Sequence, residues 1–484
     1  MVNSGFDIKK TSAFVSYSKK GNSRALIIYP PHPRIPRVHL NELGFDEYLQ
    51  KFAGKVDLLD LTHFFFGSVN CPGRKSKQIS GRVDRDFIAR LIPKDYDQYV
   101  FVLAFPKQTS IALHLAQHLK EEGKRIIFAR NIKNSYLSTP VRVRELISFP
   151  FVDVVADSFE RNIVDLVSGK SIWAIEDIWY KENGRIKKNK RAARPISLKS
   201  LPGPLYKHLE NKNVQRTFYE LSRGCIKHCD YCVHSRQALD VRPIKTVIRD
   251  LKYLIKKFNC YHFHFLCTAV NFSRKYVMDL CDAIIASGIP IRWGSYIFFD
   301  AIDDEVARKL HEAGCLFVDG GVESPQIGHL NSNKIRDIRN VERNLALLKR
   351  NGIKTYVSFM TGGINFKPNE EEEIIKFALR NKENIDYIFL NGFEIHELNI
   401  KNIIKNNKGI KVSPKYVLDQ GCYDFTEAGS YIERVKKTSK IWQKIKSAVE
   451  GRTGIKILHC ETPIDPCGSG EAEGPRDWFY MDYQ

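Results

Sequence analysis

Residues 221–233 have the sequence Leu-Ser-Arg-Gly-Cys-Ile-Lys-His-Cys-Asp-Tyr-Cys-Val and follow a strand-like run that begins at Gln215. They place Cys225, Cys229 and Cys232 in a C-x3-C-x2-C triplet on one loop. Disulfides use cysteines in pairs, so an odd triplet cannot be fully used by them. Three thiolates suit a [4Fe-4S] cluster, in which one iron would lack a protein ligand and stay open to a small chelating molecule.

A zinc-binding loop is the alternative for the same residues. Tetrahedral structural zinc takes four ligands, so His228 or His234 would have to supply the fourth. Segments further along the chain favour the cluster.

With Tyr231 at the aromatic position, the triplet resembles the C-x3-C-x-aromatic-C signature of the radical S-adenosylmethionine (SAM) superfamily. Arg223-Gly224 before the first cysteine also looks like the S-R-G-C opening of relatives that have an extra N-terminal domain. The resemblance implies that the open iron binds the amino and carboxylate groups of SAM. An electron from the cluster then splits the sulfonium and gives a 5′-deoxyadenosyl radical.

Two later segments are similar to family segments that hold SAM. Residues 320–324, Gly-Gly-Val-Glu-Ser, resemble the G-x-E-S segment, so Glu323 and Ser324 are expected beside the ribose and methionyl part of SAM. Residues 360–363, Met-Thr-Gly-Gly, end the next strand, and Gly362 is expected to let backbone approach the adenine. The resemblance thus implies SAM contacts from Tyr231, Glu323, Ser324 and Gly362.

The composition is that of a globular protein with more than one domain. The chain has 484 residues, of which 43% are hydrophobic and 27% charged, and it has eleven cysteines. Its apolar runs are too short to span a membrane and its start has no signal-peptide core, so a cytoplasmic protein without a membrane partner is expected. The net charge of +21 is compatible with a nucleic-acid partner, but the lysines are spread along the chain and no appended RNA-binding domain is recognised, so this partner is not favoured.

Strand-like and helix-like segments alternate before the cysteine loop, which predicts a doubly wound parallel sheet in an α/β domain. The expected strands are 25–29, 56–61, 99–105, 125–129 and 152–156, with helices at 110–122 and 158–168. This part resembles the B12 (cobalamin)-binding domain of one branch of the superfamily. It lacks the D-x-H-x-x-G motif, and Ala129-Arg130 stands where relatives have Gly-Gly close to the cofactor's tail. The sequence therefore predicts that cobalamin binds weakly or not at all.

After the loop, alternation continues and predicts a partial (β/α) barrel with its chemistry at the carboxyl ends of the strands. The expected strands are 261–266, 291–298, 316–320 and 354–359, with helices at 244–258, 273–286, 303–313 and 339–351. A small C-terminal region follows, in which 432–449 has the spacing of an amphipathic helix lying on the core. Cys422, Cys460 and Cys467 have loose spacing and are interpreted as unconnected thiols rather than as a second cluster.

Four segments are therefore expected. They are a B12-binding-like domain at 1–175, a basic linker at 176–210, a radical SAM core at 211–400 and a helical or irregular C-terminal extension at 401–484. The linker contains the local cluster Lys187, Lys188, Lys190, Arg191 and Arg194.

The resemblance implies a radical SAM enzyme that modifies an unactivated carbon of a metabolite or peptide by cyclisation, rearrangement or C-methylation. Its electron donor would be a protein such as flavodoxin or ferredoxin. A cobalamin-dependent radical SAM methyltransferase is the alternative reaction. A non-catalytic metal-binding protein that contacts nucleic acid through its basic surface is the alternative from another class.

Overall fold

The computed structural model describes residues 8–10, 14–16, 25–30, 56–61, 85–103, 108–129, 142–157, 159–190, 196–201, 216–232, 234–235, 237–326, 334–362, 369–396, 399–406, 412–417, 422–425 and 431–459. The chain forms two compact units. The first comprises Met1–Gln215, Lys257–Asn259 and Leu418–Gly421, and the second comprises the remaining residues.

The first unit is built on an eight-stranded sheet with the order β1-β3-β2-β4-β5-β6-β7-β8. Its strands are β1 (Phe14–Ser16), β2 (Ala25–Tyr29), β3 (Val56–Asp60), β4 (Gln98–Val102), β5 (Arg125–Ala129), β6 (Val154–Ala156), β7 (Ile178–Glu182) and β8 (Arg185–Lys188). Its helices are η1 (Ile8–Lys10), α3 (Arg85–Leu91), α4 (Thr109–Glu121), α5 (Val143–Ser148), α6 (Phe159–Val167) and η4 (Ile172–Ala174). Strands β3, β2, β4, β5 and β6 are parallel neighbours, whereas β1, β7 and β8 pair in antiparallel fashion.

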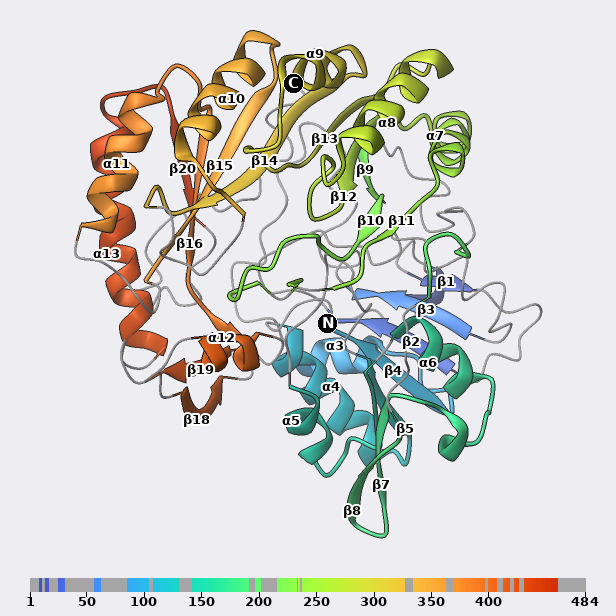
Figure 1. The fold of residues 1–484 in the computed structure, drawn as a ribbon. Helices are drawn as coiled ribbons and strands as arrows, with labels where there is room; N and C mark the ends of the chain where they lie inside the picture. The colour runs from blue at the N-terminus through green and yellow to red at the C-terminus, as the bar shows by residue number, and fades with distance from the viewer. Residues whose placement is uncertain are drawn as a thin grey trace. The chain divides into compact units, whose positions relative to one another are not determined.

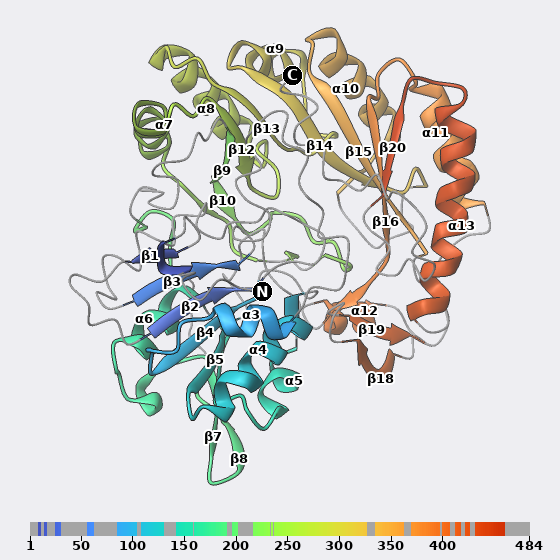
Figure 2. The same ribbon diagram turned by 180° about the vertical axis from the view of Figure 1, so that it is seen from behind.

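The parallel strands are apolar because helices cover both of their faces. All five residues of β2 are buried, as a central strand of a doubly wound sheet requires. Helices α3, α4 and α5 lie along one side of the sheet and α6 on the other (Figures 1 and 2). Between the sheet and the first three helices, Phe101 stacks on Phe128 with ring centroids 5.3 Å apart. The expected doubly wound fold is confirmed.

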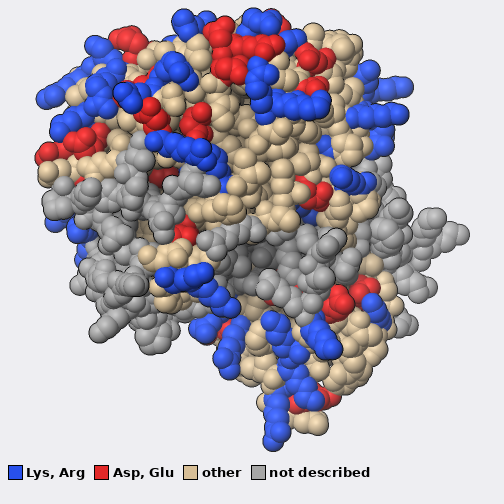
Figure 3. Space-filling model, in the orientation of Figure 1, with Lys and Arg blue, Asp and Glu red and all other residues tan. Residues whose placement is uncertain are grey.

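Part of the expected linker is instead a β-hairpin. β7 continues the sheet from β6, and β8 pairs with β7 around the turn Asn183-Gly184, where both residues have positive φ. Asn-Gly is a strong signal for a two-residue hairpin turn, and sequence analysis overlooked it. Lys187 and Lys188 therefore lie on an exposed edge strand, and basic side chains line this hairpin (Figure 3). Charged side chains on an edge strand oppose unwanted pairing with another chain.

The second unit contains a seven-stranded parallel sheet with the order β20-β16-β15-β14-β13-β12-β9. Its strands are β9 (Arg216–Glu220), β12 (His262–Leu266), β13 (Arg292–Tyr296), β14 (Cys315–Glu323), β15 (Lys354–Thr361), β16 (Tyr387–Gly392) and β20 (Lys456–His459). Its helices are α7 (Ile244–Phe258), α8 (Arg274–Ser287), α9 (Asp304–Glu312), α10 (Ile338–Arg350), α11 (Glu370–Arg380), α12 (Ile400–Asn406) and α13 (Tyr431–Glu450). The short strands are β10 (Ser222–Arg223), β11 (Asp240–Val241), β17 (Ile395–His396), β18 (Val412–Val417) and β19 (Cys422–Phe425).

Local sequence sets the ends of several of these helices. Ser273 caps α8 by accepting a hydrogen bond from Tyr276 N, and Gly288 ends the helix in the left-handed region. Asp303 caps α9 in the same way through Val306 N. No helix among the described segments of the chain has the length and hydropathy needed to cross a membrane.

The C-terminal extension completes the second unit's sheet. β20 pairs in parallel with β16, so the region expected to be helical or irregular also supplies a core strand. The amphipathic helix predicted at 432–449 is confirmed as α13, whose Trp442, Ile445 and Val449 are buried. Trp442 Nε1 donates to Thr361 Oγ1 at 2.9 Å, which joins α13 to the end of β15.

Candidate active site

The predicted site residues follow the carboxyl ends of neighbouring parallel strands in the second unit. The cysteine loop follows β9, Glu323 ends β14 and Gly362 follows β15. Parallel strands bring these ends to one edge of the sheet, where such folds carry their chemistry.

A buried ion pair and a glycine shape the start of the cysteine loop. Arg223 donates from Nε and Nη2 to the two oxygens of Glu220 at 3.0 and 2.7 Å, and both side chains are 1% exposed. Gly224 has a φ of 80°, and a Cβ there would lie 2.2 Å from the carbonyl oxygen of Ala238. Thr268 Oγ1, just beyond β12, donates to Gly224 O at 2.7 Å. Only glycine fits this position without moving the backbone.

Within the described residues, none of the three thiols that follow forms a disulfide, and backbone N–H groups face two of them. Lys227 N donates to Cys225 Sγ and His234 N donates to Cys232 Sγ, each at 3.4 Å. Burial raises the pKa of the Cys232 thiol to about 12, and the neighbouring Cys229 and Cys225 add to the rise. Backbone donors to sulfur tune iron–sulfur clusters, so this donor set fits a three-thiolate [4Fe-4S] site.

The zinc alternative receives less support. His228 is exposed, and His234 Nδ1 lies 3.4 Å from Gln237 Oε1. Within the described part of the chain, no three His, Cys, Asp or Glu side chains gather as ligands of a single ion would. A cluster distributes its three cysteines over three irons, so it does not need them to meet at one point.

Glu323 is held in an unusual conformation beside a lysine that the sequence analysis did not identify. Its φ is 65°, and its Oε1 accepts a hydrogen bond from Lys334 Nζ at 2.6 Å. A Cβ at Gly321 would lie too close to that oxygen, so a larger residue there would displace the ends of the two paired side chains. Positive φ in a residue other than glycine is often found at functional sites.

Buried carboxyl groups surround this part of the site. Burial raises the pKa of Asp319 to about 7, although the hydrogen bond from Ser358 Oγ opposes the rise. Burial also raises the pKa of Glu370 to about 7, opposed by its hydrogen bond with Ser324. Asp319, Lys334 and Glu370 were missed because no local motif marks them.

The remaining predicted contacts have structural partners. Tyr231 O accepts a hydrogen bond from Asn399 Nδ2 at 2.7 Å. Gly362 has a φ of 74°, and a Cβ there would approach Thr438 Oγ1 to 3.3 Å. Cys460 and Cys467 and the side chain of Cys422 lie outside the described residues.

Cys267, near the same edge, is a buried thiol that bonds to Ser295 Oγ at 3.2 Å. Burial raises its pKa to about 12. Cys267 is therefore a packed core residue.

An aromatic row crosses one face of the sheet. Phe218, His264, Phe317, Tyr356 and Tyr387 come from five strands, and consecutive ring centroids lie 5.6, 5.7, 5.5 and 4.3 Å apart. The helix side of the sheet has its own set, in which Trp293 Nε1 donates to Ala313 O at 2.8 Å.

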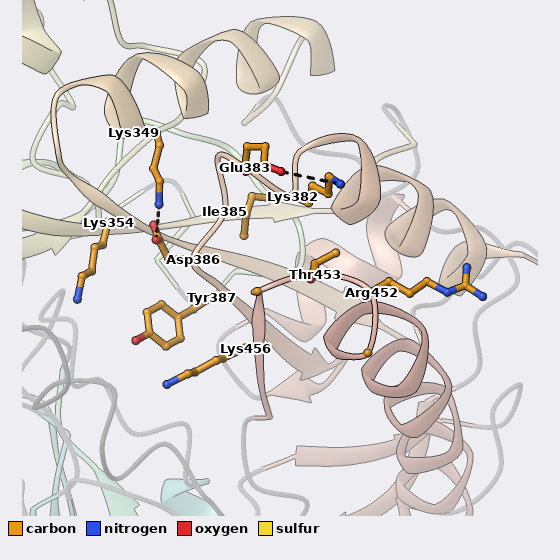
Figure 4. A pocket seen from close by; sticks show the side chains of 12 residues that line it. Lys349, Lys354, Lys382, Glu383, Ile385, Asp386, Tyr387, Arg452, Thr453 and Lys456 are labelled. Carbon is orange, nitrogen blue, oxygen red and sulfur yellow. Dashed lines mark hydrogen bonds and ion pairs between the residues drawn. The ribbon is translucent and has the colours of Figure 1, made fainter.

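A cavity of about 740 Å³ lies at the opposite, amino end of the strands (Figure 4). Lys354, Tyr387 and Lys456 begin β15, β16 and β20 there, and Lys349 pairs with Asp386 at 2.7 Å. The other lining residues are Lys382, Glu383, Ile385, Gly451, Arg452, Thr453 and Gly454. Lys349, Lys382 and Arg452 stand at helix C-termini, where cations offset the helix dipole. Because the cavity lies at the amino ends of the strands and the cysteine loop follows the carboxyl end of β9, the two sites are separate.

Residues 219–378 match the family model of the radical SAM superfamily. This segment of the chain is a radical SAM domain. The matched segment contains all three cysteines, Tyr231, Glu323, Ser324 and Gly362. The presence of a radical SAM domain makes the protein an enzyme.

A curated relative is similar over much of the chain. An uncharacterized methyltransferase of Pyrococcus horikoshii is 24% identical over 317 residues, which are 62% of this chain and 67% of the relative.

Solved structures resemble the fold. The radical SAM methyltransferase TsrM of Kitasatospora setae, solved with cobalamin and a [4Fe-4S] cluster bound, has a TM-score of 0.59 and 14% identity over 81% of each chain. The cobalamin-dependent radical SAM enzyme OxsB has a TM-score of 0.63 and 14% identity over 87% of this chain and 66% of its own. The fold is therefore that of a radical SAM core preceded by a B12-binding-like domain.

Proposed function

We propose that Cys225, Cys229 and Cys232 bind a [4Fe-4S] cluster, and that Tyr231, Glu323, Ser324 and Gly362 help hold SAM beside it. The observation that carries this proposal is the cysteine loop itself. Three thiols share one loop at the carboxyl edge of the sheet, and backbone N–H groups donate to two of their sulfurs. Glu323 ends β14 and Gly362 follows β15, at the same edge of the sheet.

The cluster, when bound, would supply the electron that splits SAM and yields a 5′-deoxyadenosyl radical. This chain's residues would orient SAM. Glu323 offers an acceptor to sugar hydroxyls. The radical would then take hydrogen from an unactivated carbon of a metabolite or peptide and lead to cyclisation, rearrangement or C-methylation. The proposed setting is the cytoplasm, with a flavodoxin or ferredoxin as electron donor.

The cysteine assignment predicts the behaviour of a triple variant. Replacing Cys225, Cys229 and Cys232 together by Ala should abolish the cluster's visible absorption and the formation of 5′-deoxyadenosine from SAM in anaerobically reconstituted, reduced protein. Cys281→Ala, which removes a buried thiol from α8, should retain both. A triple variant that keeps the absorption would show that other ligands hold the iron.

Cobalamin-dependent methyl transfer is the second candidate function. The fold likeness to TsrM and OxsB and the similarity to a methyltransferase favour it. Two features of the first unit oppose cobalamin binding. Ala129, which ends β5, is fully buried, and it stands where relatives have a glycine close to the cofactor's tail. Gln108 Nε2 donates to Pro30 O at 2.6 Å, which ties the loops after β4 and β2 at the switch point where such sheets bind ligands.

We therefore expect weak or no cobalamin binding. The purified protein would be equilibrated with hydroxocobalamin, separated from excess and examined by its absorption spectrum. A spectrum without cobalamin bands is the expected result. Stoichiometric, retained cobalamin would contradict it and would place methyl transfer first.

A further inference from the structure

Helix α12 (Ile400–Asn406) contacts the cysteine loop through two asparagines that flank its ends. Asn399 Nδ2 donates to Tyr231 O at 2.7 Å, across 168 residues of sequence. Asn406 Nδ2 donates to Asp230 Oδ2 at 2.6 Å, across 176 residues. Both contacts lie within the second unit and reach the two residues between Cys229 and Cys232.

The Asn399 amide has a fixed orientation. The residue is fully buried, and its Oδ1 accepts a hydrogen bond from His396 N at 2.7 Å. Its Nδ2 faces Tyr231 O and, at a longer 3.4 Å, Glu394 O. Turning the amide over would place its oxygen against two carbonyl oxygens and leave the His396 N–H without an acceptor. The donor toward the loop is therefore set in place before any cluster binds.

The contacted segment is short and carries two of the three thiols. Cys232 N donates to Cys229 O at 3.1 Å, so residues 229–232 form a tight turn. Fixing Tyr231 O and the Asp230 carboxylate on this turn also limits the positions of the thiols at its two ends. Other groups hold the start of the loop, where Thr268 Oγ1 donates to Gly224 O and Glu220 pairs with Arg223.

We propose that Asn399 and Asn406 are positioning residues that brace the Cys229–Cys232 turn, so that α12 helps to determine how firmly the cluster is held. The proposal rests on the proposed function, in which these cysteines are cluster ligands. It assigns to the C-terminal region a part in the metal site that the cysteine spacing does not show.

The test compares Asn399→Ala, Asn406→Ala and Asn402→Ala in the anaerobically reconstituted full chain. Asn402 is a matched control, because it lies on the same helix and bonds to Asn399 O through its backbone N–H. The readouts are the rate at which excess chelator bleaches the cluster, the electron paramagnetic resonance spectrum of the reduced cluster, and the thermal midpoint of the protein without iron.

We expect Asn399→Ala to bleach about three- to tenfold faster than wild type, as the loss of one buried hydrogen bond implies. Its resonance spectrum should shift, whereas Asn402→Ala should match wild type in both readouts. Wild-type bleaching and spectrum in Asn399→Ala would overturn the proposal. So would an equal change in Asn402→Ala.

The Asp230–Asn406 contact allows a double-mutant cycle, which keeps the proposal testable if Asn399→Ala does not fold. Asp230→Ala and Asn406→Ala should each speed bleaching, and the double variant should bleach no faster than the faster single variant. Fully additive effects of the two substitutions on the bleaching rate would overturn the proposal. Failure of the proposed function is recognised separately, because the triple cysteine variant would then keep its cluster.

Discussion

At Gly224 the cysteine loop depends on a single backbone position. The φ of 80° excludes most side chains on conformational grounds, and Ala238 O lies where a Cβ would stand. The neighbouring Glu220–Arg223 pair is buried, so it cannot relax into solvent to make room. A backbone shift at Gly224 would therefore move Cys225, the next residue in the chain.

Gly224→Ala should cost more than a matched glycine substitution in the same unit. Gly288, at the end of α8, has a φ of 65° and nothing within 4 Å of the added Cβ. Gly288→Ala should therefore lower the free energy of unfolding only by the cost of placing an alanine in the left-handed region, about 1–2 kcal/mol. The variant should keep the cluster. Gly224→Ala should lower the thermal midpoint further and lose most of the iron, measured as iron per chain after reconstitution. Equal iron content in the two variants would argue against the steric explanation.

Among the elements, α13 has a specific link to the active edge of the sheet. Its Trp442 is 4% exposed and bonds to Thr361, the residue before Gly362. The helix thus packs on the strand end that the sequence associates with adenine binding. A change in α13 should reach that strand end through this contact.

Two substitutions of Trp442 separate its hydrogen bond from its packing. Trp442→Phe should destabilise the second unit by about 1 kcal/mol, the usual net worth of one hydrogen bond. Trp442→Ala should cost about 3–5 kcal/mol because it also leaves a cavity. Trp173→Phe, at a side chain that is 58% exposed, serves as the control and should change little. Urea unfolding followed by tryptophan fluorescence measures the three effects, and an unaltered Trp442→Ala midpoint would contradict the packing role.

The elements also show what the sequence could reveal. Strands such as β2 and β5 were predicted residue for residue, because a continuous apolar run is a local signal. The β7–β8 hairpin was missed although Asn183-Gly184 marked it, since the surrounding lysines favoured a linker. β20 had no such local mark, because its place depends on pairing with β16 far earlier in the chain.

The same distinction applies to the site. The spacing of Cys225, Cys229 and Cys232 is a local pattern, and it is sufficient to identify the loop. The partners of the loop and of Glu323 could not be predicted, because Asn399 and Lys334 reach them only through tertiary packing.

At the scale of the whole molecule, the expected core at 211–400 lacks part of its own sheet. β20 covers the free edge of β16, and α13 covers apolar side chains beside it. A sheet edge without its partner strand exposes unpaired backbone groups.

A fragment spanning residues 211–400 should therefore be insoluble or should unfold without cooperativity, whereas a fragment spanning 211–459 should remain folded. Sedimentation of the expressed fragments and thermal unfolding by circular dichroism would compare them. A soluble 211–400 fragment with a sharp transition would show that β20 and α13 are dispensable.

The late position of β20 also affects how the protein is made. β16 ends at Gly392, and its partner strand begins at Lys456. At about 5–20 residues per second, synthesis of the intervening segment takes roughly 3–13 seconds. During that interval β15 can pair with one edge of the apolar strand Tyr-Ile-Phe-Leu, but its other edge lacks its partner β20. The rate of translation and the chaperones that bind nascent chains therefore affect the yield of folded enzyme.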